Sequence, residues 1–347
     1  MRRKYTFIAL AAFALAGLLP AEASQFWLYE SGAKTLTLSD TDPEAVCTPV
    51  KVYNVSPVAN DSTKLTKASD NTIPFEGCPL GGASFDFTLP IKDGEGIDYA
   101  LVSIASECFS GNNYIGSVKL PDSFETLGSG AFRSAKYLKA FAFPANPTSL
   151  TSVGDSAFYG CSRLDWLEWP ATIATIAPYM CNSSGITGIY FPAVTEIKGS
   201  AFGITPNLRT VEFGGSDGQT IVFKPQCFQG QGTTIKTIFF HEATPYLTEG
   251  FVNGGNNFLD HVGWTGLVIY LPMNASKDDV ADGWKTWVQD YLAVFAGSSF
   301  TFPQKNPGGS WTDGSWYHHA NYAPARKTYV IRAWDPAAKT VGALLCY

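Results

Sequence analysis

The chain has 347 residues, with 24 Lys or Arg against 30 Asp or Glu, and carries a formal charge of −6 at neutral pH. This balance argues against a nucleic-acid partner, which requires a basic stripe, and against binding to an anionic membrane surface. Charged residues make up only 16% of the chain, whereas aromatic residues reach 14%. We interpret this as the composition of an extracellular β-rich protein rather than of a cytosolic enzyme.

The first 23 residues predict a secretory signal peptide. A basic start at residues 2–4 precedes an apolar stretch at residues 7–19, and residues 21–23 read Ala-Glu-Ala, an A-x-A cleavage site. The apolar stretch is shorter than the ~20 residues that a membrane-spanning helix needs. We therefore expect an exported chain without membrane insertion after signal removal, located at the cell surface, in the periplasm or outside the cell.

The next segment, residues 24–72, alternates apolar and polar positions, as in QFWLYES and TLTLSD. Alternation with period two is typical of half-buried strands. We predict a short β-rich N-terminal cap here, because the first unit of a stacked array would otherwise expose an apolar edge.

Within residues 73–272 a short pattern recurs six times, and each copy has a strand half and an anchor half. The strand halves are apolar and mostly end in Pro: residues 115–121, 138–144, 164–170, 186–192, 208–214 and 235–241. The anchor halves place an apolar residue five positions before an aromatic one: residues 104–109, 127–132, 153–158, 176–181, 197–202 and 223–228. A fixed period of this size indicates a solenoid, whose function is usually surface recognition.

Alternation within the strand halves separates an interior from an exterior. The positions one and three before the strand end are apolar in every copy, as in Phe141, Leu167 and Ile189, and are expected in the core. The positions two and four before the end should face outward as a ladder: Ser117, Lys119, Ala140, Ala142, Trp166, Glu168, Gly188, Tyr190, Thr210, Glu212, Thr237 and Phe239.

Exposed aromatic residues mark interaction sites more often than chance. From the outward ladder we therefore predict six partner-binding residues: Lys119, Trp166, Glu168, Tyr190, Glu212 and Phe239. The alternative is that a neighbouring loop or the C-terminal segment covers the aromatic members.

The seven cysteines allow two interpretations. Cys161 and Cys181 fall in neighbouring repeats and could form a disulfide, as could Cys47 and Cys78 in the N-terminal part. Buried free thiols that act as small apolar side chains are equally compatible with the sequence. Because Cys181 replaces the anchor aromatic of its copy, we predict a local packing defect or a disulfide there.

The pattern C-x-x-L-x-x-Φ-x-Φ-P followed by I-x-x-x-A-F resembles the BspA-like class of leucine-rich repeats, with GCSRLDWLEWP (Gly160–Pro170) as the best copy. The resemblance spans roughly residues 73–287, from a degenerate copy at Phe75–Pro90 to LVIYLP (Leu267–Pro272). It implies a β-dominated leucine-rich-repeat solenoid with one strand ladder and short turns or 3-10 segments on the opposite side. Proteins with this repeat are typically exported or surface-displayed by bacteria and some parasites, and several act as adhesins.

The C-terminal part divides into two segments. Residues 273–296 look like the helical end cap common after such arrays. Residues 297–347 contain a Gly/Pro-rich turn and the strand-like TYVIRAW, and predict a small β module or a partly disordered tail.

Candidate catalytic and metal-binding motifs are weak. The segment GGSDG (residues 214–218) fits G-x-S-x-G, but strand-like residues follow instead of the helix that a nucleophile elbow needs. Asp93, Glu95 and Asp98 in a Gly-rich turn suit calcium, yet the EF-hand spacing is missing and a solvated loop is favoured. We predict no catalytic residue, no metal site and no cofactor. Asn54, Asn60, Asn182 and Asn274 begin N-x-S sequons, which matter only if the source glycosylates exported proteins.

The sequence therefore predicts an exported, non-enzymatic, monomeric binding or adhesion protein that contacts an extracellular protein or glycan through its ladder. One alternative is a carbohydrate-binding tail at residues 297–347, using His318 and His319 with Trp311, Trp316 and Tyr322, on a repeat spacer. An exported hydrolase is the other alternative.

Overall fold

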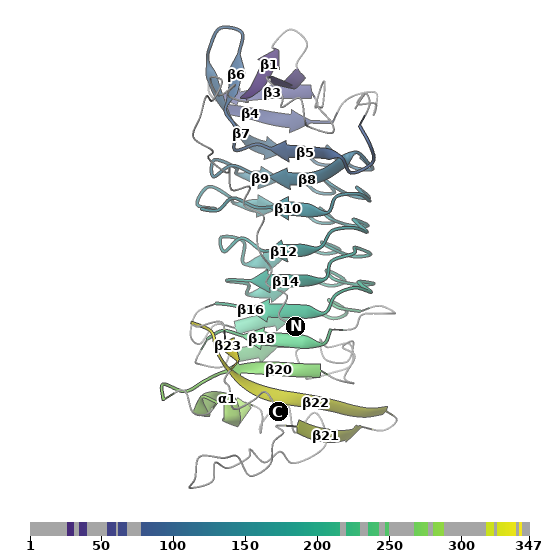
Figure 1. Ribbon diagram of the computed structural model, residues 1–347, viewed down its shortest axis with the longest axis vertical. Helices are drawn as coiled ribbons and strands as arrows, with labels where there is room; N and C mark the ends of the chain where they lie inside the picture. Colours follow the sequence, from purple (N-terminus) through teal and green to yellow (C-terminus); the bar gives the residue numbers. More distant parts are fainter. Residues whose placement is uncertain are drawn as a thin grey trace, which may run out of the picture.

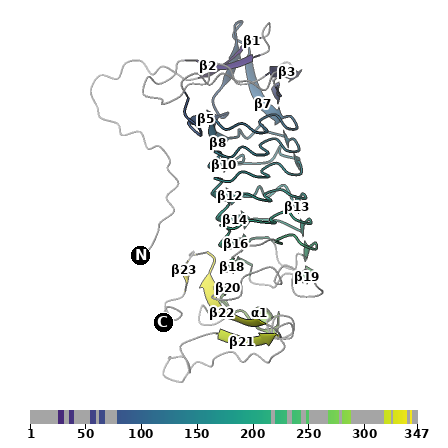
Figure 2. The same ribbon diagram turned by 90° about the vertical axis from the view of Figure 1, so that its right-hand side faces the viewer.

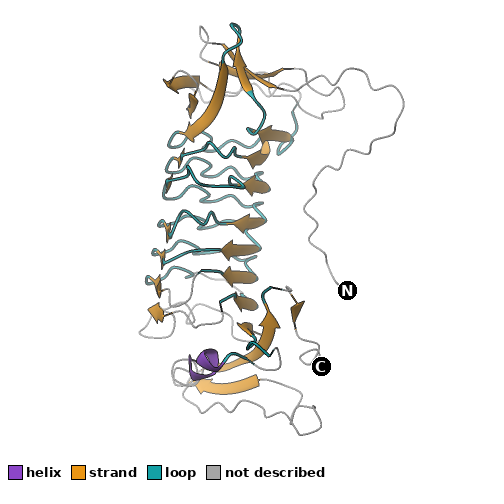
Figure 3. Ribbon diagram, turned by 90° about the vertical axis from the view of Figure 1, so that its left-hand side faces the viewer, coloured by secondary structure: helices purple, strands orange, loops and turns teal. Residues whose placement is uncertain are grey.

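The structure is a computed structural model of the chain. It describes residues 26–30, 35–39, 54–59, 62–67, 78–215, 220–229, 235–242, 247–249, 267–276, 280–287, 317–322, 325–337 and 340–341. The predicted signal peptide and Cys47 lie outside these ranges. The described residues wind into a tall stack of coils (Figure 1), with short strands on two opposite sides of the stack (Figure 3).

The main ladder is built from the predicted strand halves. It contains β5 (Ala83–Asp86), β8 (Ile115–Lys119), β10 (Ala140–Ala142), β12 (Trp166–Glu168), β14 (Gly188–Phe191), β16 (Thr210–Phe213), β18 (Thr237–Phe240) and β20 (Leu267–Pro272). Neighbouring strands pair in parallel except between β10 and β12, and from β12 to β18 the pairing aligns Leu167, Ile189, Val211 and Ile238 along the stack. All four are fully buried, which confirms the predicted interior positions.

A second ladder lies on the opposite side (Figure 2). It contains β7 (Asp98–Ile104), β9 (Thr126–Leu127), β11 (Ser152–Val153), β13 (Thr175–Ile176), β15 (Glu196–Ile197), β17 (Thr220–Phe223) and β19 (Leu247–Glu249). Neighbouring strands of this ladder pair in parallel except between β11 and β13. The expectation of turns or 3-10 segments on this side is therefore incomplete. Strands of two residues are too short to show the alternation by which the main ladder is recognised.

The third side of each coil is the turn that follows a second-ladder strand. Residues with positive φ flank each anchor, two positions before and two after it: Glu107 and Gly111, Gly130 and Ser134, Ser156 and Gly160, Tyr179 and Ser183, Ser200 and Ile204. The anchor N–H groups point along the stack, and those of Phe109, Phe132 and Phe158 donate to carbonyl oxygens of the next coil at 2.7–2.9 Å. The third side is thus also hydrogen-bonded from coil to coil.

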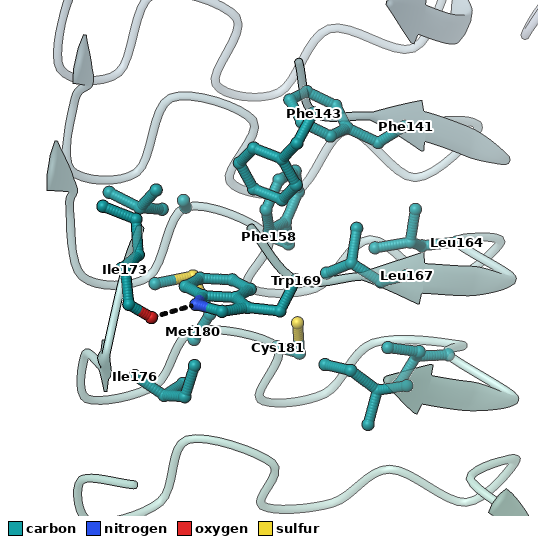
Figure 4. Packing of buried hydrophobic residues seen from close by; sticks show 14 of the residues in the cluster. Phe141, Phe143, Phe158, Leu164, Leu167, Trp169, Ile173, Ile176, Met180 and Cys181 are labelled. Carbon is teal, nitrogen blue, oxygen red and sulfur yellow. Dashed lines mark hydrogen bonds between the residues drawn. The ribbon is translucent and has the colours of Figure 1, made fainter. Parts of the chain in front are cut away.

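The anchor rings form a column inside the stack. Phe109, Phe132 and Phe158 stack with ring centroids 5.1 and 6.1 Å apart, and Phe202 and Phe228 continue the column at 4.9 Å. Cys181 interrupts it. In that coil Trp169 points across the interior and donates its indole N–H to the Ile173 carbonyl at 2.8 Å (Figure 4). A large ladder residue therefore accompanies the small anchor.

Four of the five described cysteines are buried free thiols, as one of the two interpretations of the sequence expected. Cys108, Cys161, Cys181 and Cys227 are free and 0–1% exposed. The possible Cys161–Cys181 disulfide is therefore wrong, because the apolar interior accommodates both thiols as small side chains. Cys78 is disulfide-bonded, and its partner lies outside the described residues, as Cys47 does.

Both ladders are interrupted at the same level of the stack. On the main ladder the pairing stops between β10 and β12, and on the second ladder it stops between β11 and β13. The spacing between β10 and β12 is visibly wider than between their neighbours (Figures 1 and 2). The third side continues across this level, since Ser156, Phe158 and Gly160 donate to Pro178, Met180 and Asn182 at 2.9–3.1 Å. We call this level the break.

The N-terminal end is a closed β-sheet. Strands β1 (Phe26–Glu30), β2 (Thr35–Ser39), β3 (Asn54–Ala59), β4 (Ser62–Thr66) and β6 (Ile91–Asp93) join β7 in the closed order β7-β4-β3-β2-β1-β6-β7. Trp27 anchors this barrel to the first coil, because its ring stacks on Phe87 and its indole N–H donates to the Asp86 carbonyl at 3.0 Å. Strand β7 belongs to both the barrel and the second ladder.

The C-terminal end combines a helix with added strands. Helix α1 (Asp282–Trp287) buries Trp284 and Trp287 against Phe240. Strand β22 (Ala325–Asp335) extends the main ladder in parallel beside β20, and β21 (Tyr317–Tyr322) and β23 (Thr340–Val341) pair with it antiparallel. The strand-like tail segment is thus part of the ladder.

Candidate interaction surface

Five of the six predicted partner-binding residues lie on one continuous sheet. Trp166 and Glu168 are on β12, Tyr190 on β14, Glu212 on β16 and Phe239 on β18. The pairing aligns Glu168, Tyr190, Glu212 and Phe239 in one outward row across the strands. Trp166 and Glu168 are exposed, whereas the other three are partly buried.

Lys119 lies apart from the other five. It is on β8, in the separate sheet β10-β8-β5 on the far side of the break, and its ammonium group pairs with the Asp86 carboxylate at 3.5 Å. The break therefore divides the predicted ladder surface, and Lys119 does not share a sheet with the aromatic residues.

The Trp166 ring packs against the neighbouring strand β14. A Cβ atom placed on Gly188 would come within 2.3 Å of the Trp166 ring, so the ring occupies the space that a side chain at position 188 would fill. Gly188 is Trp166's register partner on β14. Trp166 remains 36% exposed. The contact with Gly188 limits the movement of the ring, and the rest of the side chain is open to solvent.

The row beside Trp166 is acidic. Tyr190 stands between Glu168 and Glu212, and burial together with the carboxylates of Glu168, Glu212 and Glu242 raises the pKa of its phenol. Glu212 contacts His241 through Oε2 and Nε2 at 3.1 Å. The His241 ring also lies 5.1 Å from the ring of Tyr190, which limits the freedom of both side chains.

Phe239 is covered, as the alternative to an exposed aromatic row foresaw. Its ring stacks on Tyr270 at 4.3 Å and meets the ring of Trp334 edge-on at 4.7 Å. Trp334 comes from β22 and donates its indole N–H to the Phe240 carbonyl at 2.7 Å. His241, Tyr270 and Trp334 were not among the predicted site residues. The Trp at the end of TYVIRAW, Trp334, is the sequence signal that could have indicated the cover.

The candidate calcium turn is held together by its own hydrogen bonds. Asp93 Oδ1 accepts the N–H groups of Glu95 and Ile97 at 3.0 and 2.8 Å, and Lys92 pairs with Asp98 at 2.8 Å. This agrees with a solvated loop. Across the described ranges, no group of three or more His, Cys, Asp or Glu side chains is placed to hold a metal ion.

Other candidate positions fall inside the fold or outside the described residues. Asn182 is 8% exposed and contacts Ser183 and Ser200 through its side chain, so its sequon is inaccessible in the folded chain. Ser216 of GGSDG, Trp311 and Trp316 lie outside the described residues, whereas His318 and His319 are on β21. No helix in the described part of the chain is long and apolar enough to span a membrane.

Comparison with known proteins identifies the repeat. The family model of the BspA type leucine rich repeat region matches residues 98–244 in six copies. Among curated proteins, none matches the chain.

Solved structures with a similar fold are distant in sequence. The leucine-rich repeat protein of T. pallidum is 19% identical, with 52% of this chain and 89% of that chain covered and a TM-score of 0.35. A leucine-rich repeat protein from Bacteroides ovatus is 11% identical, with 74% and 71% covered and a TM-score of 0.35. A leucine rich cell surface protein from Faecalibacterium prausnitzii is 14% identical, with 69% and 89% covered and a TM-score of 0.27.

The six matched copies coincide with the coils whose strands and anchors are described above. Residues 98–244 of the chain are therefore a BspA type leucine rich repeat region.

Proposed function

We propose that this protein is an exported, non-enzymatic binding protein that contacts another extracellular protein through the main ladder at Trp166, Glu168 and Tyr190. The repeat family supports a surface role in protein binding. The observation that carries the proposal is the position of Trp166. Among the described residues, six large apolar side chains are at least 36% exposed, namely Leu80, Ile97, Tyr114, Trp166, Tyr179 and Ile204, and Trp166 alone of these is on a main-ladder strand.

The energetics favour this position as an anchor. A rigid aromatic ring loses little conformational entropy on binding, and Trp and Tyr dominate the binding energy of protein interfaces. Trp166 is already held against Gly188 before any partner arrives, which reduces that cost further. Adhesion to a host or matrix protein would use the same surface.

The test uses the mature protein on an array of extracellular-matrix proteins and glycans. Replacing Trp166 and Tyr190 together by Ala should weaken binding to the protein partner by at least tenfold, because both ring contacts are lost. Tyr179→Ala is the matched control, since Tyr179 is 49% exposed but lies on the third side. Equal binding by the double variant, at an unchanged melting temperature, would exclude this surface. Binding that is confined to glycans and insensitive to the double variant would instead favour the tail.

A further inference from the structure

The outward face around Trp166 carries two carboxylates, Glu168 and Glu212, and Glu212 contacts His241. The outward positions of β12, β14 and β16 are Trp166, Glu168, Gly188, Tyr190, Thr210 and Glu212. Within the described residues Glu168 forms no ion pair. The nearby Arg209 turns its guanidinium to the carbonyl oxygens of Pro206 and Leu208, at 2.8 and 3.3 Å.

From this face we infer that the partner presents a cationic side chain, Lys or Arg, whose charged group rests on the Trp166 ring and is neutralised by Glu168. This rests on the proposed function and names the chemistry of its partner. The quadrupole of a Trp ring attracts a cation placed over its face, and adjacent carboxylates add direct charge pairing. The raised pKa of the Tyr190 phenol is consistent with a negative field at this position.

A neutral glycan fits less well. Sugars stack on exposed aromatic rings too, but they need hydrogen-bonding groups that reach their hydroxyls around the ring. Here the ring's register neighbours are Gly188, which has no side chain, and Thr210 beyond it. On the outward side of β12, the Glu168 carboxylate forms no ion pair with any other described residue, which favours a cation.

The probes are a Lys-Gly repeat peptide, its Glu-Gly counterpart and a neutral oligosaccharide, titrated calorimetrically into the mature protein. We expect the Lys-Gly peptide to bind best, and Trp166→Ala and Glu168→Gln each to weaken it about fivefold or more. Glu125→Gln is the control, because Glu125 is an exposed carboxylate next to the second-ladder strand β9. High salt should weaken binding by the native protein.

Two outcomes would overturn the inference. One is equal weakening by Glu168→Gln and Glu125→Gln, which would indicate general charge attraction. The other is tighter binding of the acidic peptide or the sugar. If the array partner is lost in the Trp166 and Tyr190 double variant while no peptide binds, the proposed function stands and the cationic chemistry is wrong.

A separate observation concerns the break. The coil before it contains β10 and β11, and the coil after it contains β12 and β13. Neither ladder joins these coils by strand pairing, whereas three backbone hydrogen bonds join them on the third side. One further bond, from the Asp165 N–H to the Lys139 carbonyl at 3.0 Å, lies where the main-ladder strands begin. Other coil boundaries between β14 and β18 are paired along both ladders.

One ring contact crosses the break: the rings of Phe143 and Trp169 meet at 5.4 Å from the two sides (Figure 4). In the coil before the break, Phe158 packs against Phe141 and Phe143 at 4.7 and 6.2 Å. These contacts are apolar and lack the directional hydrogen bonds of the ladders. Opening at this level therefore disrupts less backbone pairing than opening at another boundary.

We propose that the solenoid opens locally at the break, with the third side acting as the hinge. The chain contains its own reporters. Cys161 and Cys181 lie on the two sides of the break, whereas Cys108 and Cys227 lie in coils away from it. All four thiols are 0–1% exposed, so each reacts only when its surroundings open. Burial also raises their pKa, to about 12 for Cys161 and Cys227.

The test is alkylation of the native protein with iodoacetamide, with the modified fraction of each cysteine followed by mass spectrometry. We expect Cys161 and Cys181 to react at least tenfold faster than Cys108 and Cys227. Hydrogen exchange provides a second measurement without any substitution, and the amides of β10 and β12 should exchange faster than those of β14 and β16. Equal protection of the four thiols, or fastest reaction at Cys227, would overturn the proposal.

Discussion

At the scale of single residues, the unusual feature is the pair of left-handed positions around each anchor. Most of these positions hold Ser or Gly, but one holds Ile204, whose φ is 53°. A β-branched residue is strained in this region because its side chain crowds the backbone. Ile204 is also 51% exposed, so it gains little from burial in return.

Replacing Ile204 by Gly should therefore stabilise the protein by up to about 1 kcal/mol, because relief of the left-handed strain exceeds the entropy cost of glycine. The measurement is the midpoint of urea unfolding. Ile97→Gly serves as the control, since Ile97 is 43% exposed and lies outside the positive-φ positions. It should lose stability, and a shift of both variants in the same direction would contradict the argument.

At the scale of the elements, close stacking of coils depends on particular glycines. A Cβ atom at Gly128 would lie 2.2 Å from the backbone nitrogen of Ser106, and one at Gly154 would lie 2.4 Å from that of Ser129. Both contacts involve the backbone of the preceding coil, which cannot swing aside as a side chain could. The N–H groups of Gly128 and Gly154 also donate to the preceding coil at 2.8 Å.

We expect Gly128→Ala and Gly154→Ala each to destabilise the protein by about 1–3 kcal/mol, the usual cost of forcing an extra methyl group into a packed site. Gly94→Ala is the control, because nothing lies within 4 Å of its Cβ position. That variant should be neutral or slightly stabilising. The measurement is the thermal unfolding midpoint of the three variants. An unchanged midpoint for Gly128→Ala would show that the coils can move apart at this position without loss of stability.

At the scale of the whole molecule, the C-terminal strands complete the stack. Trp334 is 5% exposed, bonds the Phe240 carbonyl and contacts the rings of Phe239 and His241. Because each coil of a solenoid contacts only its neighbours, damage at one end should loosen that end first.

Trp334→Ala should cost about 3–5 kcal/mol in local stability. In hydrogen exchange, β18, β20 and β22 should lose protection, whereas β8 and β10 keep theirs. Trp334→Phe is the partial control, since it retains a ring and loses only the indole hydrogen bond. Uniform loss of protection along the whole stack would contradict nearest-neighbour stability.

The sequence predicted the parts of this architecture that repeat with a clear period. Phe141, Leu167 and Ile189 could be assigned to the interior because apolar residues recur at the same alternate positions of the strand half in every copy. The two-residue strands of the second ladder could not be recognised, because each offers only one buried residue, such as Val153 or Ile176. The cover over Phe239 depends on Trp334, which is 95 positions away and has no place in the repeat.

The two ends of the stack differ from its middle in strand direction and closure. The open end of a stack of parallel strands can pair with parallel strands of further molecules without limit, as happens in a fibril. At one end, however, β7 is taken up into a barrel whose strands pair in a closed circle, and at the other β21 reverses direction beside β22. An antiparallel neighbour presents a different hydrogen-bond pattern from a parallel one. The number of coils in the stack is thus determined by the single chain and not by the number of molecules that associate.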